Sequence, residues 1–178
     1  MSLFTATFLT AIFLIGFGVL LFFQKEASEK ALKAFPRSKK MTYLFMAIAV
    51  SWFSLRLYNL APSDFGEHKD LLLALFLATA VASFYFIPDF LSARALAGCI
   101  LLLADALLDA AFMQAPTTRL FLVSYVYLMI LIAFILGASP YLIRDWIHWI
   151  FKTPYRVNGF AFTFLSYGLL LMLVAFTY

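Results

Sequence analysis

The chain has 178 residues, of which 65% are hydrophobic and 12% are charged, and its formal net charge is +4. About a quarter of the residues of a soluble domain are charged, so this composition excludes an ordinary soluble protein. It predicts a single all-α integral membrane domain over residues 1–178. The basic residues fall at the ends of apolar segments and in one loop, which is typical of topology signals, and we expect no nucleic-acid partner.

Six apolar segments are long enough to cross a lipid bilayer as helices. They cover residues 3–23, 41–61, 71–87, 94–113, 120–138 and 157–177. We therefore predict a polytopic membrane helical bundle with six transmembrane helices plus one short interfacial amphipathic helix. The first segment lacks the basic n-region and short apolar core of a cleaved signal peptide, so we expect it to be retained.

A polar connector, KEASEKALKAFPRSKK, follows the first segment. Its acidic and basic side chains recur at the i,i+4 spacing that stabilises a helix, with the acid first: Glu26 with Lys30, and Glu29 with Lys33. This pattern predicts that the first helix continues to about Phe35, where Pro36 ends it. Two further prolines mark boundaries: Pro88 after the third segment and Pro116 before the fifth.

Charged residues lie inside two of the apolar segments. The fourth segment carries Asp105 and Asp109, which are one helical turn apart on one face. Measured from Arg94 at about 1.5 Å per residue, they lie roughly 16 and 22 Å along the helix, which puts Asp105 near the bilayer centre. A charged Asp there costs roughly 2.5–3.5 kcal/mol, so this face should turn away from lipid.

The second segment contains Arg56, roughly 24 Å beyond Lys40 and thus at much the same depth as Asp109. Three readings stay open. Arg56 and Asp109 form a buried clamp between two helices; or the second acid titrates as an ion or proton relay; or Arg56 snorkels to the outer interface and pairs with nothing. Asn59 is placed to extend the network in the first two cases.

Residues 140–152, PYLIRDWIHWIFK, predict the interfacial helix. Arg144, Asp145, His148 and Lys152 share one face, and apolar side chains occupy the rest. We expect Trp146 and Trp149, with Arg144 and Lys152, to anchor it at the headgroup level. A simple extension of the fifth helix is the alternative, although Pro140 opposes it.

The distribution of Lys and Arg predicts orientation. With the first connector inside, ten of these residues lie on the inner side and two on the outer side. We therefore expect a multi-pass protein of the cell membrane with both termini on the outer, non-cytoplasmic side. Small residues suggest where helices pack closely: Ala74, Ala78 and Ala82 on the third segment, and Gly16 and Gly18 on the first.

Signatures of enzymes are mostly absent from the sequence. We expect no metal site, because His68 and His148 are predicted on opposite sides and no cysteine lies near either. We also expect no cofactor. The sequence favours a non-enzymatic subunit of a membrane complex or a small homo-oligomer, with the lipid bilayer and other membrane subunits or a second copy as partners. A small proton- or cation-coupled transporter or channel using Asp105, Asp109 and Arg56 is the alternative, and a lipid-modifying enzyme ranks third.

Overall fold

The computed structural model describes residues 1–59, 66–86 and 89–178, and within these ranges every regular element is helical. The α-helices are α1 (Leu3–Phe23), α2 (Lys25–Ala34), α3 (Lys39–Tyr58), α4 (Lys69–Phe86), α5 (Leu91–Ala111), α6 (Arg119–Ala138), α7 (Tyr141–Phe151) and α8 (Pro154–Ala175). Two 3-10 helices, η1 (Phe35–Arg37) and η3 (Gly66–His68), precede α3 and α4. Six helices are long and apolar enough to cross a membrane, as a multi-pass membrane protein requires.

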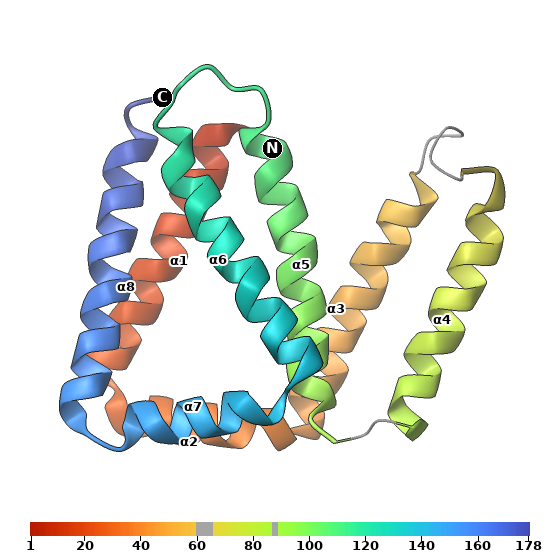
Figure 1. Ribbon diagram of the computed structural model, residues 1–178, viewed down its shortest axis with the longest axis horizontal. Helices are drawn as coiled ribbons and strands as arrows, with labels where there is room; N and C mark the ends of the chain where they lie inside the picture. Colours follow the sequence, from red (N-terminus) through yellow and green to blue (C-terminus); the bar gives the residue numbers. More distant parts are fainter. Residues whose placement is uncertain (60–65, 87–88) are drawn as a thin grey trace.

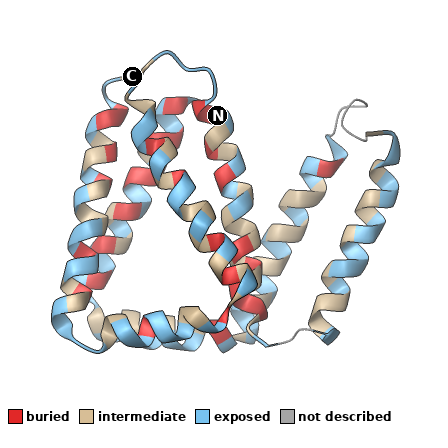
Figure 2. Ribbon diagram, viewed as in Figure 1, coloured by how far each residue is buried: buried red, intermediate tan, exposed pale blue. Residues whose placement is uncertain are grey.

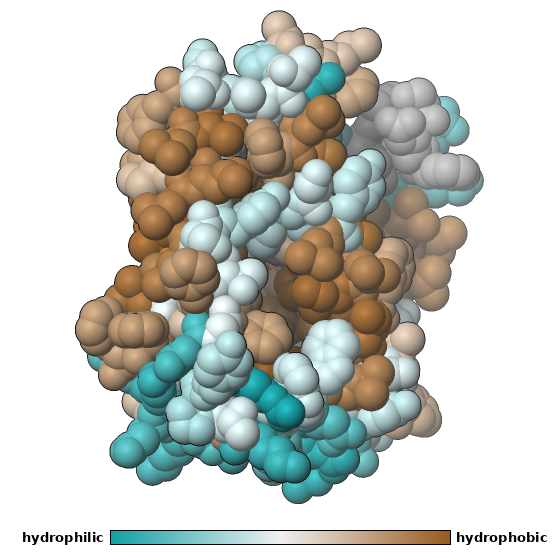
Figure 3. Space-filling model, turned by 60° about the vertical axis from the view of Figure 1, so that its left-hand side comes forward, coloured by the Kyte–Doolittle hydropathy of each residue, from teal (hydrophilic) through white to brown (hydrophobic). Residues whose placement is uncertain are grey.

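The six long helices run up and down between two ends of the molecule, and α2 and α7 lie across one of those ends (Figure 1). Both chain termini lie at the opposite end. Helices α1 and α8 pack together along their lengths, α5 packs against α6 and α3, and α2 contacts α7. Figure 3 shows hydrophilic side chains gathered at the end that holds α2 and α7, below an apolar middle. This arrangement fits the predicted in-plane position of α7.

The pairing of the first and last long helices depends on two glycines. A Cβ atom on Gly18 would lie 2.8 Å from Leu165 Cγ, and one on Gly168 would lie 3.0 Å from the backbone nitrogen of Ile15. Because neither glycine carries a Cβ atom, the two backbones approach closely, which favours helix association in a bilayer. The predicted role of Gly18 in close packing is therefore confirmed, whereas Gly16 has no neighbour within 4 Å of its would-be Cβ atom.

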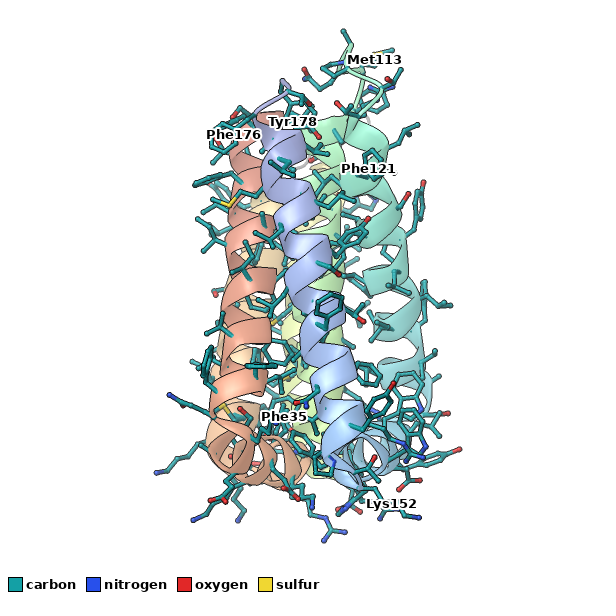
Figure 4. The ribbon with its side chains drawn as sticks, turned by 90° about the vertical axis from the view of Figure 1, so that its left-hand side faces the viewer. Phe35, Met113, Phe121, Lys152, Phe176 and Tyr178 are labelled. Atoms are coloured by element: carbon teal, nitrogen blue, oxygen red, sulfur yellow. The ribbon has the colours of Figure 1, made fainter. Side chains whose placement is uncertain are left out.

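The C-terminal residues are tied to the same end of the bundle. The hydroxyl group of Tyr178 lies 3.5 Å from the carbonyl oxygen of Thr118, and the hydroxyl group of Thr7 lies 3.5 Å from that of Tyr178. The ring of Phe176 packs edge-on against Phe4. Figure 4 shows Phe176 and Tyr178 together at this end and Lys152 at the other.

The prediction that the first helix continues to Phe35 is wrong. The backbone leaves the helical region at Gln24 (φ −116°, ψ 53°), and α2 then runs across the molecule. The far end of this connector is fixed by Ser92 on α5, whose fully buried hydroxyl group donates to the carbonyl oxygens of Phe35 (3.0 Å) and Pro36 (2.8 Å). A straight extension of α1 would carry Phe35 away from α5, so this tertiary contact determines the bend.

Several predicted boundaries also change. The fourth span was expected at 94–113 but runs from Leu91 to Ala111, because Phe112 is extended and Met113 adopts a left-handed conformation (φ 53°). The second span begins at Lys39 and continues through Arg56 without interruption. The expected ends of the second and third spans, 60–61 and 87, and the break at Pro88 lie outside the described residues. A separate helix over 140–152 is confirmed as α7, since Ser139 leaves the helical conformation.

The α3–α4 hairpin contributes little to the core. Within the described chain, α4 packs mainly on α3 and has no buried residue, and the only buried residue of α3 is Leu57. Figure 2 shows α4 in the colours of exposed and half-buried residues, and α3 largely in the same colours. In the predicted small-residue ladder, Ala74 and Ala78 are exposed and Ala82 is half-buried, so this ladder makes no close contact within the chain.

Candidate functional site

Arg56 on α3 bridges both aspartates of α5. Its Nη2 atom lies 2.5 Å from Asp105 Oδ2 and 3.1 Å from Asp109 Oδ2. Helices α3 and α5 pack together and run in the same direction, so Arg56 faces two carboxylates that α5 presents one turn apart. We call Arg56, Asp105 and Asp109 the charged triad.

This geometry differs from the predicted clamp in one respect. We expected Arg56 to pair with Asp109 and to leave Asp105 without a cation, but Asp105 is the nearer partner. The reading in which Arg56 pairs with nothing is wrong. The cause is the length of the guanidinium side chain, which reaches both acids from a position between them.

The charged triad is only partly covered by the rest of the chain. The side chains of Arg56, Asp105 and Asp109 are 43%, 55% and 64% exposed, so the predicted burial is not reached within one chain. Because α5 begins at Leu91 and not at Arg94, Asp105 lies roughly 21 Å along the helix and Asp109 roughly 27 Å. Asp109 is two residues from the end of α5 at Ala111. The triad therefore lies closer than predicted to the end of the bundle that holds the two chain termini.

A cavity of about 830 Å³ opens beside the triad, between α3, α4 and α5. Arg56, Asn59 and Asp105 form its polar part. Apolar side chains form most of the remaining wall, with Phe53 and Phe76 4.3 Å apart between ring centroids. The sequence identified the three polar residues but not the cavity, since no local pattern places α4 opposite α3 and α5.

The prediction that Asn59 extends the ion network is wrong for the contacts among the described residues. The side-chain amide of Asn59 donates to the carbonyl oxygen of Leu55 (2.9 Å), at the end of α3. Asn59 nevertheless lines the cavity beside Arg56 and Asp105.

Three of the predicted anchor residues, Arg144, Trp146 and Trp149, lie on α7 at the end of the molecule that also holds α2, and Lys152 directly follows this helix. Trp146 and Trp149 are 44% and 52% exposed, as expected of side chains that lie at a lipid interface. Arg144 donates from Nε to Asp145 Oδ1 (3.0 Å). The guanidinium group of Arg156, which the sequence did not single out, lies 4.4 Å from the centre of the Trp149 ring and donates to the Trp149 carbonyl oxygen (3.1 Å).

Comparisons of this chain with protein-family models, with curated proteins and with solved structures found no match. The residues and their geometry therefore carry the functional inference.

No group of three or more His, Cys, Asp or Glu side chains within residues 1–59, 66–86 and 89–178 is arranged to hold a metal ion. Two buried polar atoms have no hydrogen-bond partner among these residues: Arg94 Nη1 on α5 and Asn158 Oδ1 on α8. The first is a donor and the second an acceptor. The sequence marked Arg94 as the start of the fourth segment and as one of the ten inner basic residues, but it did not mark Asn158, which belongs to no charge or spacing pattern.

Proposed function

We propose that this chain is a non-enzymatic membrane subunit, part of a membrane complex or of a small homo-oligomer, in which another chain covers the α3–α4–α5 side. The observation that carries the proposal is the exposure of the charged triad, 43–64% per side chain, on helices that are apolar enough to span a bilayer. We place the protein in the cell membrane with both termini on the non-cytoplasmic side, because the basic residues concentrate at the opposite end.

The energetic argument concerns what surrounds the exposed part of the triad. One arginine and two aspartates leave one unbalanced negative charge. Facing hydrocarbon, even a single charged residue costs a few kcal/mol, and intramembrane acids almost always face a bundle interior or water. A second chain over this side would remove the triad from lipid and supply hydrogen-bond partners.

The α3–α4 hairpin supports the same conclusion independently. In contrast to α1 and α8, it has almost no buried surface in the chain, and its alanine ladder at Ala74 and Ala78 is open. Small residues of this kind let helices of different chains approach closely. The hairpin is therefore the part of the molecule best suited to contact another chain.

Disulfide cross-linking in native membranes tests the proposal. Ala78→Cys on α4 and Ser166→Cys on α8, each in a background lacking the single native cysteine, are both exposed and lie near the middle of their helices. We expect copper phenanthroline to cross-link the Ala78→Cys protein to a second copy, or a photoactivated benzophenone maleimide on that cysteine to cross-link it to another membrane protein, and neither reagent to cross-link the Ser166→Cys protein. Equal cross-linking at both positions, or none at Ala78→Cys, would contradict the proposal.

The mass of the purified protein, expressed without other subunits, distinguishes a homo-oligomer from a complex with a different protein. A mass in lipid nanodiscs of two or more chains, after subtraction of the lipid and scaffold, would favour the homo-oligomer. A single chain per nanodisc together with a cross-linked heterologous partner in native membranes would favour the complex.

A proton- or cation-coupled transporter is a second candidate. The cavity between α3, α4 and α5 favours it, because Arg56 and Asp105 line this cavity and could be reached by an ion within it. Proteoliposomes with wild type and Asp105→Asn protein test it. Flux under a pH gradient that Asp105→Asn abolishes would favour transport, and we expect no such flux.

A further inference from the structure

The polar end of the cavity between α3, α4 and α5 is lined by Arg56, Asn59 and Asp105, and the carboxylate of Asp109, which lies outside the cavity lining, is 3.1 Å from the guanidinium group of Arg56. Within the described residues, only the Oδ2 atom of the Asp105 carboxylate is engaged, by Arg56. The side chain of Asn59 also lines the cavity, and its amide group can accept a hydrogen bond as well as donate one. We infer that this cavity binds a monovalent organic cation with an apolar body.

The charge balance selects a cation over an anion. The single guanidinium of Arg56 is already shared between two carboxylates, so the three groups leave one negative charge unbalanced. An anionic head group would meet the carboxylate of Asp105 beside a guanidinium group that Asp109 already engages, whereas a cation restores neutrality.

The walls of the cavity select an apolar body. Leu57, Leu101 and Leu102 supply aliphatic surface, and the rings of Phe53 and Phe76 lie together on the same wall. Aromatic faces attract organic cations, and this attraction strengthens where water is excluded. The volume of about 830 Å³ lies within the range of small-molecule sites.

This inference goes beyond the proposed subunit function, because it concerns a ligand held within one chain. Its site lies on the side that we propose another chain covers, and such a chain would close the mouth of the cavity. Cross-linking reports the assembly and ligand binding reports the cavity, so either proposal can fail while the other stands.

Equilibrium dialysis with the purified full-length protein in nanodiscs of a neutral lipid tests the inference. The probe is tetraphenylphosphonium, and the control ligand is tetraphenylborate, an anion of nearly the same shape. We expect saturable binding of the cation above the binding to empty nanodiscs, and at least tenfold weaker binding of the anion. No saturable cation binding, or equal affinity for the two ions, would overturn the inference.

Two variants remove the site by different routes. Asp105→Asn removes the unbalanced charge, and Gly98→Leu adds volume at a residue that lines the cavity without altering any charge. A Cβ atom on Gly98 would lie 3.9 Å from Ala49 Cβ, which is an ordinary van der Waals distance. We expect each variant to weaken tetraphenylphosphonium binding at least tenfold. The control Asp145→Asn removes an equally accessible carboxylate on α7 and should leave binding unchanged.

Far-UV circular dichroism and size-exclusion profiles confirm that each variant is folded before dialysis. If Asp105→Asn fails to fold, Gly98→Leu still decides the outcome, because it alters none of the charges of the triad. Wild-type affinity in Gly98→Leu would overturn the inference, and so would a loss in Asp145→Asn equal to that in Asp105→Asn, because binding would then follow overall charge.

Discussion

The charged triad should respond unequally to the loss of its members. Removing Arg56 leaves two carboxylates one turn apart with no cation, whereas removing Asp109 leaves Arg56 and Asp105 as a neutral pair 2.5 Å apart. Breaking a covered ion pair so that one charge is uncompensated costs roughly 3–5 kcal/mol. We therefore expect Arg56→Leu to destabilise the assembled protein by about this amount, and Asp109→Ala by less than about 1 kcal/mol.

The loss of stability caused by Arg56→Leu should depend on whether the chain is assembled with another chain. In a dissociated chain the three side chains are 43–64% exposed, and intramembrane charges exposed in this way draw in water from the interface, where ion pairs contribute only about 0.2–1 kcal/mol. Covered by a second chain, the same groups lose their contact with water and the larger cost applies. Arg56→Leu should therefore cost about 3 kcal/mol more in the associated protein than in the dissociated chain.

Reversible unfolding in mixed micelles, followed by tryptophan fluorescence, measures both states if the ratio of protein to detergent is varied. Replacing all three residues of the triad with leucine is the control, because it removes the charges together and should recover most of the stability lost in Arg56→Leu. Equal costs for Arg56→Leu and Asp109→Ala would refute the shared arginine. A cost that does not change with association would refute the covering of the triad by a second chain.

Three further predictions concern the fold and its orientation. Gly18→Ala should be about 1–3 kcal/mol less stable than Gly16→Ala in a thermal melt, since both gain the same helix propensity but only Gly18 meets α8; equal stability would contradict the close approach. Ser92→Ala removes the side-chain donor of the Pro36 carbonyl oxygen and one of the two donors of the Phe35 carbonyl oxygen, which keeps the Ser38 N–H, so it should cost about 1–3 kcal/mol and speed proteolysis within α2; an unchanged cleavage rate would argue against this anchor. In a cysteine-free background, an impermeant maleimide added to intact cells should label Thr117→Cys but not Ala31→Cys, and the reverse pattern would place both termini inside.

The sequence predicted the elements of this fold well because their signals are local. Apolar length alone located six long helices, and Pro140 with the paired tryptophans located α7. The match in depth between Arg56 and the two aspartates followed from the helical rise and the direction of the segments, and the structure brings all three together.

The sequence could not predict features that depend on contacts between distant residues. The i,i+4 pairs of the connector stabilise a helix equally well whether it continues α1 or bends across the bundle, and the pair of Glu29 and Lys33 forms in the bent α2. The bend follows from the anchor of Ser92 on Phe35, more than fifty residues away in the chain. The exposure of the triad could not be predicted from the sequence either, because it depends on where α4 packs and on which chain covers the α3–α4 hairpin.

The α1–α8 side and the α3–α4–α5 side of the molecule are stabilised by different kinds of contact, and this difference bears on function. On one side, glycines bring α1 and α8 into close contact and apolar side chains fill the core. On the other, α3 is joined to α5 across a charged triad, and α4 rests on α3 without a buried residue. Lipid gives no hydrophobic drive for helix association, so a loosely packed hairpin with an unbalanced charge has most to gain from a ligand or a second chain. The incomplete packing and the candidate chemistry thus coincide at the α3–α4–α5 side, and variants on that side should change binding and assembly before they change the α1–α8 core.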